Sequence, residues 1–222
     1  MRAWIRFGKQ PRLRFISHLD LQRFFQRAVN RTGLPIAWTQ GFNPHPVMSF
    51  GSALALGWTS EYEVIDIKLS APMGRRRVEE AVRAALPGDL PVLEVKLMDD
   101  RHPAPMALVK MSDYRIEFPK GDGEAVLRQI PAFLASDRVM AVKKSKSGEK
   151  EIDVRPMALK VAEADGGIEC RLMLTEQATL KPDLLVKVLS EMAGVEPPEP
   201  RIHRTLLWGA DDQGQPAPLM KL

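Results

Sequence analysis

The most distinctive chemical pattern in the sequence is a run of arginines spaced four residues apart, Arg23, Arg27 and Arg31. On a helix this spacing places the three guanidinium groups on one face. Like charges at that spacing repel one another, so such a ridge is unfavourable unless anions meet it. The pattern predicts contact with phosphate groups, and the alternative is a solvated surface face. Further cations lead into the same segment, at Lys9, Arg12 and Arg14.

The residues just before the ridge add to this prediction. Ser17 and Asp20 have the spacing of a capping box, so the helix is expected to begin at this point. Backbone N–H groups in the first turn of a helix attract anions, and His18 lies among them. We therefore expect an anion site at the amino end of the helix.

A second basic group is expected on the first strand. Residues 2–7 alternate in polarity, which places Arg2, Trp4 and Arg6 together on one face. A cationic strand that carries an aromatic side chain suits stacking with nucleotide bases. The competing interpretation is that Trp4 packs against the second half of the chain.

The segment 38–60 is long, rich in glycine, proline and aromatic residues, and without Asp, Glu, Lys or Arg. Loops of this kind often carry function, but rigid turns have the same composition. His45 lies between two prolines and is a candidate general acid or base near neutral pH, with His18 as a further candidate. We expect Asn43, His45 and Ser49 to line a cleft beside the amino end of the helix, with Asn43 contacting RNA.

A flexible basic loop is expected later in the chain, where Lys143, Lys144 and Lys146 lie close together. Such a loop is often the solvated tip of a hairpin, and it could equally close over a bound RNA strand. The single cysteine, Cys170, excludes an internal disulfide and an iron–sulfur cluster held by this chain alone. The four histidines have no metal-ligand spacing, so neither a metal nor a cofactor is expected in this chain.

Charge is distributed unevenly along the 222 residues. The net charge is +4, yet residues 1–60 hold eight cations and one acid, whereas the remaining residues hold 24 cations and 27 acids. This local excess predicts a region that binds a polyanion. No stretch has the roughly 20 apolar residues of a membrane span, and the alternating amino-terminal residues differ from a signal peptide. We expect a cytoplasmic protein with no membrane partner.

The periodicity of the apolar residues predicts an α+β fold. Alternating strands and amphipathic helices follow the order β-α-β-β-α-β twice, on either side of a polar, proline-containing joint at 99–105. Two tandem ferredoxin-like (split βαβ) units with antiparallel sheets fit this order. We therefore predict two domains, a basic one at residues 1–100 and another at 101–222 that ends in a short flexible tail from Ala210.

Several elements can be predicted individually. In the second half we expect a helix over 123–135 kinked at Pro131, a strand over 138–142, and a hairpin closed around residues 165–167. The arginine helix of the first half has an apolar stripe that should face the core. This stripe consists of Leu21, Phe24, Phe25, Ala28 and Val29.

Four short segments occur together in a recognisable order: Ser17-His18-Leu19-Asp20, Gly41-Phe42-Asn43-Pro44-His45-Pro46, Ser60-Glu61-Tyr62 and Asp153-Val154-Arg155-Pro156. On these segments the chain resembles the bacterial radical SAM-linked proteins, a family of unknown function found beside, or fused to, a cobalamin-binding-type radical SAM protein. The resemblance runs from residue 1 to about residue 208. It implies association with a radical enzyme in RNA or ribosome-related metabolism, and it assigns no catalytic residues.

A lone cysteine cannot hold the three-cysteine cluster of a radical SAM enzyme, so the iron–sulfur cluster and S-adenosylmethionine are expected in the partner. The leading hypothesis is an accessory protein that binds a structured RNA, a tRNA or rRNA, and presents it to that partner. No preference for DNA is expected. Two alternatives stay open: an RNA-processing or RNA-modifying enzyme that uses His45 or His18, and a protein-only partner whose basic face meets an acidic protein.

Overall fold

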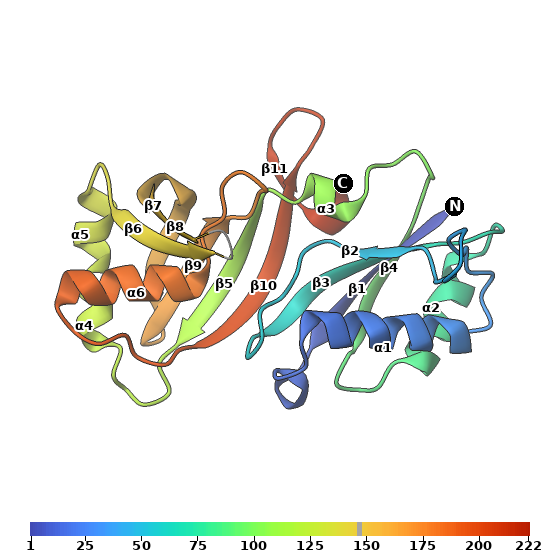
Figure 1. Ribbon diagram of the computed structural model, residues 1–222, viewed down its shortest axis with the longest axis horizontal. Helices are drawn as coiled ribbons and strands as arrows, with labels where there is room; N and C mark the ends of the chain where they lie inside the picture. Colours follow the sequence, from blue (N-terminus) through green and yellow to red (C-terminus); the bar gives the residue numbers. More distant parts are fainter. Residues whose placement is uncertain (146–147) are drawn as a thin grey trace. The chain divides into compact units, whose positions relative to one another are not determined.

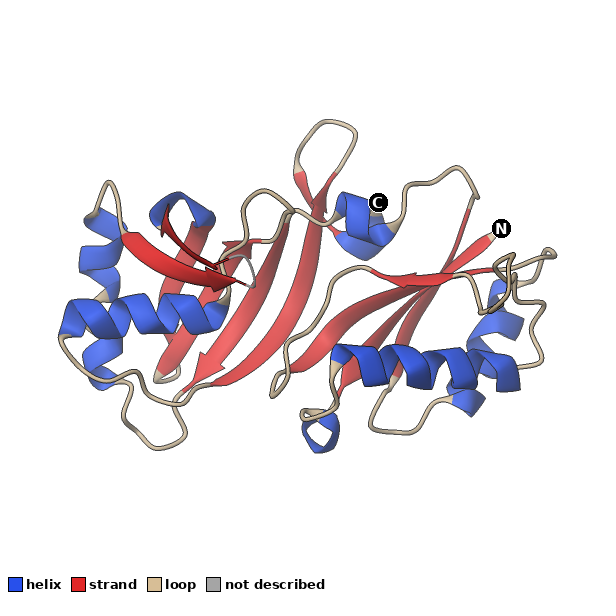
Figure 2. Cartoon of the chain, viewed as in Figure 1, coloured by secondary structure: helices blue, strands red, loops and turns tan. Residues whose placement is uncertain are grey.

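The computed structural model describes residues 1–145 and 148–222 and divides the chain into two compact units (Figure 1 and Figure 2). The first unit comprises Met1–Val109 and Leu207–Leu222, and the second comprises Lys110–Leu206. The described chain combines helices with mostly antiparallel strands, which is the predicted α+β class. No helix within the described ranges has the length and apolar content of a membrane span.

The sheet of the first unit has the strand order β4-β1-β3, and the short strand β2 also pairs with β3. These pairs are antiparallel. The strand β2 pairs with the second half of β3, whereas Ile36 makes an isolated bridge with Leu69. The strands are β1 (Arg2–Lys9), β2 (Met48–Phe50), β3 (Thr59–Lys68) and β4 (Val92–Met98).

Two helices, α1 (His18–Arg31) and α2 (Arg75–Ala85), pack on one face of this sheet (Figure 1). Because side chains alternate along a strand, every second residue of β1 enters the core between sheet and helices. The predicted stripe of α1 lies in this core, although Phe24 is only partly buried. The core includes Ala3, Ile5 and Phe7 from β1, Leu21, Phe25 and Val29 from α1, and Val78, Ala81 and Val82 from α2.

The opposite face of the sheet is covered by the end of the chain. Leu219 and Met220 are buried, and the backbone N–H of Met220 donates to the hydroxyl of Tyr62 on β3 at 3.1 Å. This segment was expected to be a flexible tail. It is ordered because its apolar residues find a place on the sheet, a contact that its polar and proline-containing composition does not reveal. The covering elements are α3 (Pro105–Leu108), β11 (Pro216–Pro218) and the short 3-10 helix η3 (Leu219–Lys221).

The second unit repeats much of this arrangement. Its sheet has the order β10-β5-β9-β8, with β10 contributing residues up to Leu206, and the pairs β5–β9 and β8–β9 are antiparallel. The predicted hairpin is confirmed, since Ala164 pairs with Gly167 across the turn. The strands are β5 (Met111–Glu117), β8 (Ala158–Ala164), β9 (Gly167–Met173) and β10 (Arg201–Ala210).

Two predicted elements of the second unit differ in the structure. The helix expected over 123–135 is divided into α4 (Glu124–Leu127) and α5 (Ile130–Ala135), because Pro131 cannot donate the backbone hydrogen bond that a continuous helix needs. The strand expected over 138–142 is longer, and it pairs only with the next strand, in a separate two-stranded sheet. These strands are β6 (Met140–Ser145) and β7 (Gly148–Asp153), followed by the 3-10 helix η2 (Arg155–Met157) and, later, α6 (Pro182–Ala193).

Candidate nucleic-acid interface

The helix α1 holds the arginine ridge on the exposed surface of the first unit. Its first turn is fixed by Ser17, whose hydroxyl oxygen accepts a hydrogen bond from the backbone N–H of Asp20 at 3.1 Å. Because the apolar stripe faces the sheet, Arg23, Arg27 and Arg31 are exposed on the other side of the helix. Successive arginines four residues apart are about 6 Å apart along the helix axis.

The ridge has few acidic partners. Arg23 lies 3.5 Å from the carboxylate of Asp20, in a contact that is exposed to solvent, and Arg31 donates to the carbonyl oxygen of Ala85 at 3.5 Å. Arg27 makes no ion pair in the part of the chain that the structure describes. Only one of the three guanidinium groups therefore has an acidic partner among the described residues, so the ridge keeps an excess of positive charge.

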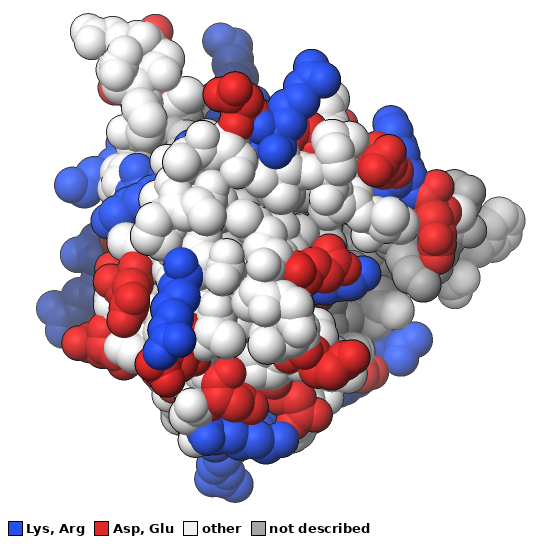
Figure 3. Space-filling model, turned by 90° about the vertical axis from the view of Figure 1, so that its left-hand side faces the viewer, with Lys and Arg blue, Asp and Glu red and all other residues white. Residues whose placement is uncertain are grey.

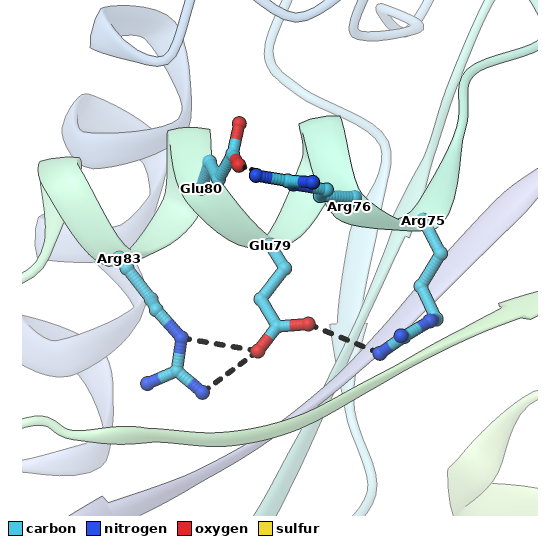
Figure 4. Close-up of polar contacts among 5 residues, drawn as sticks. All are labelled: Arg75, Arg76, Glu79, Glu80 and Arg83. Atoms are coloured by element: carbon cyan, nitrogen blue, oxygen red, sulfur yellow. Dashed lines mark hydrogen bonds and ion pairs between the residues drawn. The ribbon is translucent and has the colours of Figure 1, made fainter.

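The neighbouring helix α2 shows the opposite arrangement (Figure 4). Glu79 accepts hydrogen bonds from Arg75 at 3.1 Å and from Arg83 at 2.8 Å, and Glu80 accepts one from Arg76 at 2.8 Å. Each pair joins residues four apart, the spacing at which opposite charges stabilise a helix. Most arginines of α2 are therefore neutralised by acids on their own helix.

Arg77 is the arginine of α2 that this pairing leaves out, because Ala81 occupies the position four residues later. It lines a groove of about 510 Å³ between the two helices, together with Arg31 and Thr32 of α1's carboxyl end. The rest of the lining consists of Glu80, which is paired with Arg76, and three small alanine side chains. Arg77 was not predicted from the sequence as a candidate. The spacing could have indicated it, because Arg75 and Arg76 each have a glutamate four residues later and Arg77 does not.

The segment before α1 extends the basic surface. Arg12 has an 85% exposed side chain and lies 3.6 Å from Asp89, and Arg14 lies over the ring of Phe15 at 4.6 Å from its centroid. Phe15 is itself 67% exposed. Phe15 was not predicted from the sequence. It is an exposed aromatic residue beside Arg14, and such a residue suits base stacking.

Lys9 supports this segment from below instead of contributing to the surface. Its side chain is buried, and its ammonium donates to the carbonyl oxygens of Arg14 at 3.2 Å and Ile16 at 2.8 Å. Burial lowers the pKa of the Lys9 ammonium, and the nearby negative charge of Glu63 acts in the opposite direction. A lysine held in this way positions Arg14 and Phe15.

The predicted basic face of β1 is occupied by contacts within the first unit. Arg2 binds the carboxylate of Asp66 through two guanidinium nitrogens, and Trp4 is fully buried with its ring against His102. Arg6 lies 3.6 Å from Glu94. Trp4 is therefore not exposed for base stacking; its partner His102 lies in the second of the two predicted domains but in the same unit of the structure as Trp4.

The part of the uncharged loop that carries Asn43 and His45 lies away from the amino end of α1, whereas the later part reaches it: the backbone N–H of Gly57 donates to the carbonyl oxygen of Arg14 at 2.8 Å, and Phe50 lies against His18. Trp38 pairs with Pro46, and Val47 accepts a hydrogen bond from Lys68, at the end of β3 that faces the start of β1. Arg12 follows the other end of β1, about 20 Å away for a strand of this length. Asn43 and His45 are therefore not brought into a cleft with Arg12.

The two candidate catalytic histidines contact residues of their own surroundings. Nδ1 of His45 lies 3.1 Å from the hydroxyl of Thr39 and 3.2 Å from the carbonyl oxygen of Asn43, contacts that hold the loop together. His18 packs its ring against Phe50, with the ring centroids 5.1 Å apart. The contacts of His45 lie within its own loop, and the contact of His18 joins the start of α1 to β2.

Of the three lysines that were predicted to form a basic loop, Lys143 is the one whose side chain the structure describes, and it lies on β6. Lys143 donates to the carbonyl oxygen of Thr179 at 3.2 Å. Lys146 lies outside the residues that the structure describes, as does the side chain of Lys144. Figure 3 shows a face of the molecule on which acidic and basic side chains alternate around an uncharged area. This mixed surface contrasts with the arginine series of α1.

Within the described ranges, no cluster of three or more histidine, cysteine, aspartate or glutamate side chains is placed to hold a metal ion. Cys170 is buried, and burial raises the pKa of its thiol, with the negative charge of Asp113 acting in the same direction. A thiol in this environment is a poor nucleophile.

A family model matches most of the chain. Residues 2–182 match the model of a family described as uncharacterized proteins conserved in bacteria, DUF2344. No curated protein matches the chain.

Proposed function

The chain belongs to the DUF2344 family of uncharacterized proteins conserved in bacteria, and we propose that it is an RNA-binding accessory protein. In this proposal it binds a structured RNA, a tRNA or rRNA, in the cytoplasm and presents it to a partner radical SAM enzyme. The partner carries the iron–sulfur cluster and binds S-adenosylmethionine. The proposal of the partner rests on the sequence resemblance, and the proposal of RNA rests on the interface described above.

One observation carries the RNA proposal: among the described residues only one of the three ridge arginines of α1, Arg23, has an acidic partner, whereas three of the four arginines of α2 are paired with acids on their own helix. Arg23, Arg27 and Arg31 follow one face of a helix, and Arg77 joins them across the groove. A row of exposed guanidinium groups suits the phosphates of an RNA backbone, because each can form charge-assisted hydrogen bonds with phosphate oxygens.

Phe15 adds a second kind of contact at one end of this row. Its exposed ring, with the Arg14 guanidinium on it, offers a surface on which an unpaired base can stack. Stacking of this kind requires a base that is not paired, so it favours single-stranded or looped regions of a folded RNA. It is tolerant of base identity.

We also infer that each unit is a variant of the ferredoxin-like fold. The order β4-β1-β3-β2 in the first unit and β10-β5-β9-β8 in the second supports this inference, because each corresponds to a β-α-β-β-α-β chain with its first and third strands in the middle. In the second unit the β6–β7 hairpin is an insertion between a helix and the second strand of that pattern.

The experiment compares two triple variants with the same change in net charge. The first replaces Arg23, Arg27 and Arg31 of α1 with glutamine, and the second replaces Arg75, Arg76 and Arg83 of α2. Binding to a bulk tRNA preparation is measured by filter retention at two salt concentrations. We expect the α1 variant to bind at least tenfold more weakly, with a salt slope smaller by about 0.7–0.9 for each phosphate that it no longer binds.

The α2 variant serves as the control for long-range charge. It should keep most of the affinity, because its arginines are engaged with Glu79 and Glu80. Both variants should fold, since neither change touches the core. Equal affinity of the α1 variant and the wild type for tRNA would refute the proposed interface. An equal loss of affinity in both triple variants would show that binding depends only on net charge.

A further inference from the structure

Two adjoining hollows lie in the second unit, where the β6–β7 hairpin meets the segment 175–181 and the start of α6. Their volumes are about 330 and 510 Å³, within the range of pockets that hold small ligands. Lys143 and Thr179 line both of them. Because the ammonium of Lys143 donates to the carbonyl oxygen of Thr179 at 3.2 Å, these two residues form the wall that the hollows share.

The charge in these hollows is positive and poorly neutralised. The two acids in the lining, Asp153 and Asp183, accept hydrogen bonds from backbone N–H groups, Asp153 from Val139 at 3.0 Å and Asp183 from Leu184 at 2.9 Å. Neither forms an ion pair with a lysine in the part of the chain that the structure describes. The lysines of the lining are Lys143, Lys150, Lys181 and Lys187, of which Lys187 lies 3.5 Å from Glu191.

The remaining walls are aliphatic. Val142 and Leu184 line the smaller hollow, and Ile152, Met157 and Met173 line the larger one. Neither lining includes an aromatic side chain. Bases of single-stranded RNA are held by stacking on aromatic rings, so these walls suit an aliphatic group better than a nucleotide. A largely apolar pocket with a few converging cations is typical of sites for amphipathic anions.

We propose that the second unit binds a small organic anion in this lysine-lined site, a phosphate or carboxylate carried on an aliphatic body. The anionic group lies among Lys143, Lys181 and Lys187, and the aliphatic body lies along Val142 and Leu184. This site is separate from the arginine interface of α1, and the inference does not depend on the proposed RNA function.

The test is calorimetric titration of the full chain with octyl phosphate, octanoate and inorganic phosphate. The two octyl compounds are used below the concentrations at which they form micelles. One or both octyl compounds should bind with a stoichiometry of one, and the stronger of the two identifies the anionic group. Inorganic phosphate should bind at least tenfold more weakly than that compound, because it lacks the aliphatic body. Lys181→Gln should weaken binding about tenfold, the loss expected for one charge-assisted hydrogen bond.

The matched control is Lys160→Gln, an exposed lysine on β8 of the same unit that lines neither hollow. It should bind the octyl compounds as the wild type does, and so should the triple variant of α1. An equal loss in Lys160→Gln, or equal affinity for inorganic phosphate, would show a general charge effect and overturn the site. Displacement of the octyl compounds by a single-stranded oligonucleotide would assign the hollows to RNA and overturn the small-anion proposal.

Discussion

Lys9 illustrates how burial changes the role of a charged residue. The sequence analysis placed it among the RNA contacts because it precedes Arg12 and Arg14. In the structure its ammonium is engaged with two carbonyl oxygens of the next loop, below the surface that those arginines form. In the proposed interface Lys9 therefore has an indirect role: it fixes the backbone that carries Arg14 and Phe15.

We expect Lys9→Met to lower the free energy of unfolding by about 3 kcal/mol, because it removes two hydrogen bonds and the positive charge that acts on buried Glu63. Urea denaturation measures this change. Adding Glu63→Gln to the variant should restore part of the loss. Lys68→Met, at an exposed position on β3, is the control and should change stability by less than about 0.5 kcal/mol. Wild-type stability of Lys9→Met would contradict the supporting role.

Cys170 gives a pH dependence with a defined sign. Burial raises its pKa in the folded state, so the folded protein holds the thiol proton at pH values where the unfolded chain releases it. The contribution to stability is complete below the unfolded pKa of about 8.5 and is lost as pH rises through the folded pKa. Relative to Cys170→Ala, the wild type should therefore lose stability from about pH 9 upward, by up to about 1.4 kcal/mol per pH unit.

Chemical denaturation of both proteins between pH 7 and pH 10.5 measures this difference. The variant acts as the control for other groups that titrate in the same range, such as Tyr62, whose pKa is also raised by burial. A thiol reagent added to the native protein should react slowly, and denaturant should remove the protection. Parallel pH profiles for the two proteins would contradict this account of the thiol.

Among the elements, those with a strong local pattern were predicted from the sequence. The stripe of α1 and the hairpin before Gly167 both follow from residues close together in the chain. The failures share a cause. The cover over the face of Arg2 and Trp4 comes from residues 102 and 219–222, and no local pattern reports contacts across such distances.

The interface was predictable to the same extent. The alternation of β1 places Arg2, Trp4 and Arg6 on one face, as expected, but it cannot show whether that face meets solvent. The exposure of Arg23, Arg27 and Arg31 follows from the periodicity of their own helix and was predicted. The groove with Arg77 depends on how two helices pack, which the sequence of either helix leaves undetermined.

Gly167, at the start of β9, provides a test at the level of elements. A Cβ atom added at this position would lie 2.2 Å from the backbone carbonyl oxygen of Ile116 on β5, too close for any atom pair without a bond. We expect Gly167→Ala to lower the free energy of unfolding by about 2–3 kcal/mol through strand displacement. Gly88→Ala, where nothing lies within 4 Å, is the control. Equal stability of the two variants would show that β5 and β9 can separate without cost.

At the scale of the whole chain, the first unit is built from two distant segments. Its sheet comes from the first 98 residues, and its cover comes from the segment after Leu207. We expect a variant that ends at Pro218 to lose about 3 kcal/mol or more of stability, because Leu219 and Met220 bury their side chains in this unit.

The same variant should expose Trp4, which is fully buried in the intact chain. Acrylamide quenching of tryptophan fluorescence measures this exposure. Truncation should increase quenching in the wild-type sequence, and the increase should be smaller when Trp4→Phe is also present. Unchanged quenching on truncation would show that other residues are sufficient to cover the indole.

The place of Met220 has a consequence for how the protein is made. A ribosome releases the strands of the first unit early, and domains commonly begin to fold as they emerge. The hydroxyl of Tyr62 cannot receive its hydrogen bond from Met220 until the whole second unit has been translated, on the order of ten seconds later at usual elongation rates. During that interval the nascent chain presents an uncovered aromatic and basic sheet face, the kind of surface that chaperones bind. Emergence of residues 219–222 from the ribosome removes that surface, so folding of the first unit is completed only after the second unit has been synthesised.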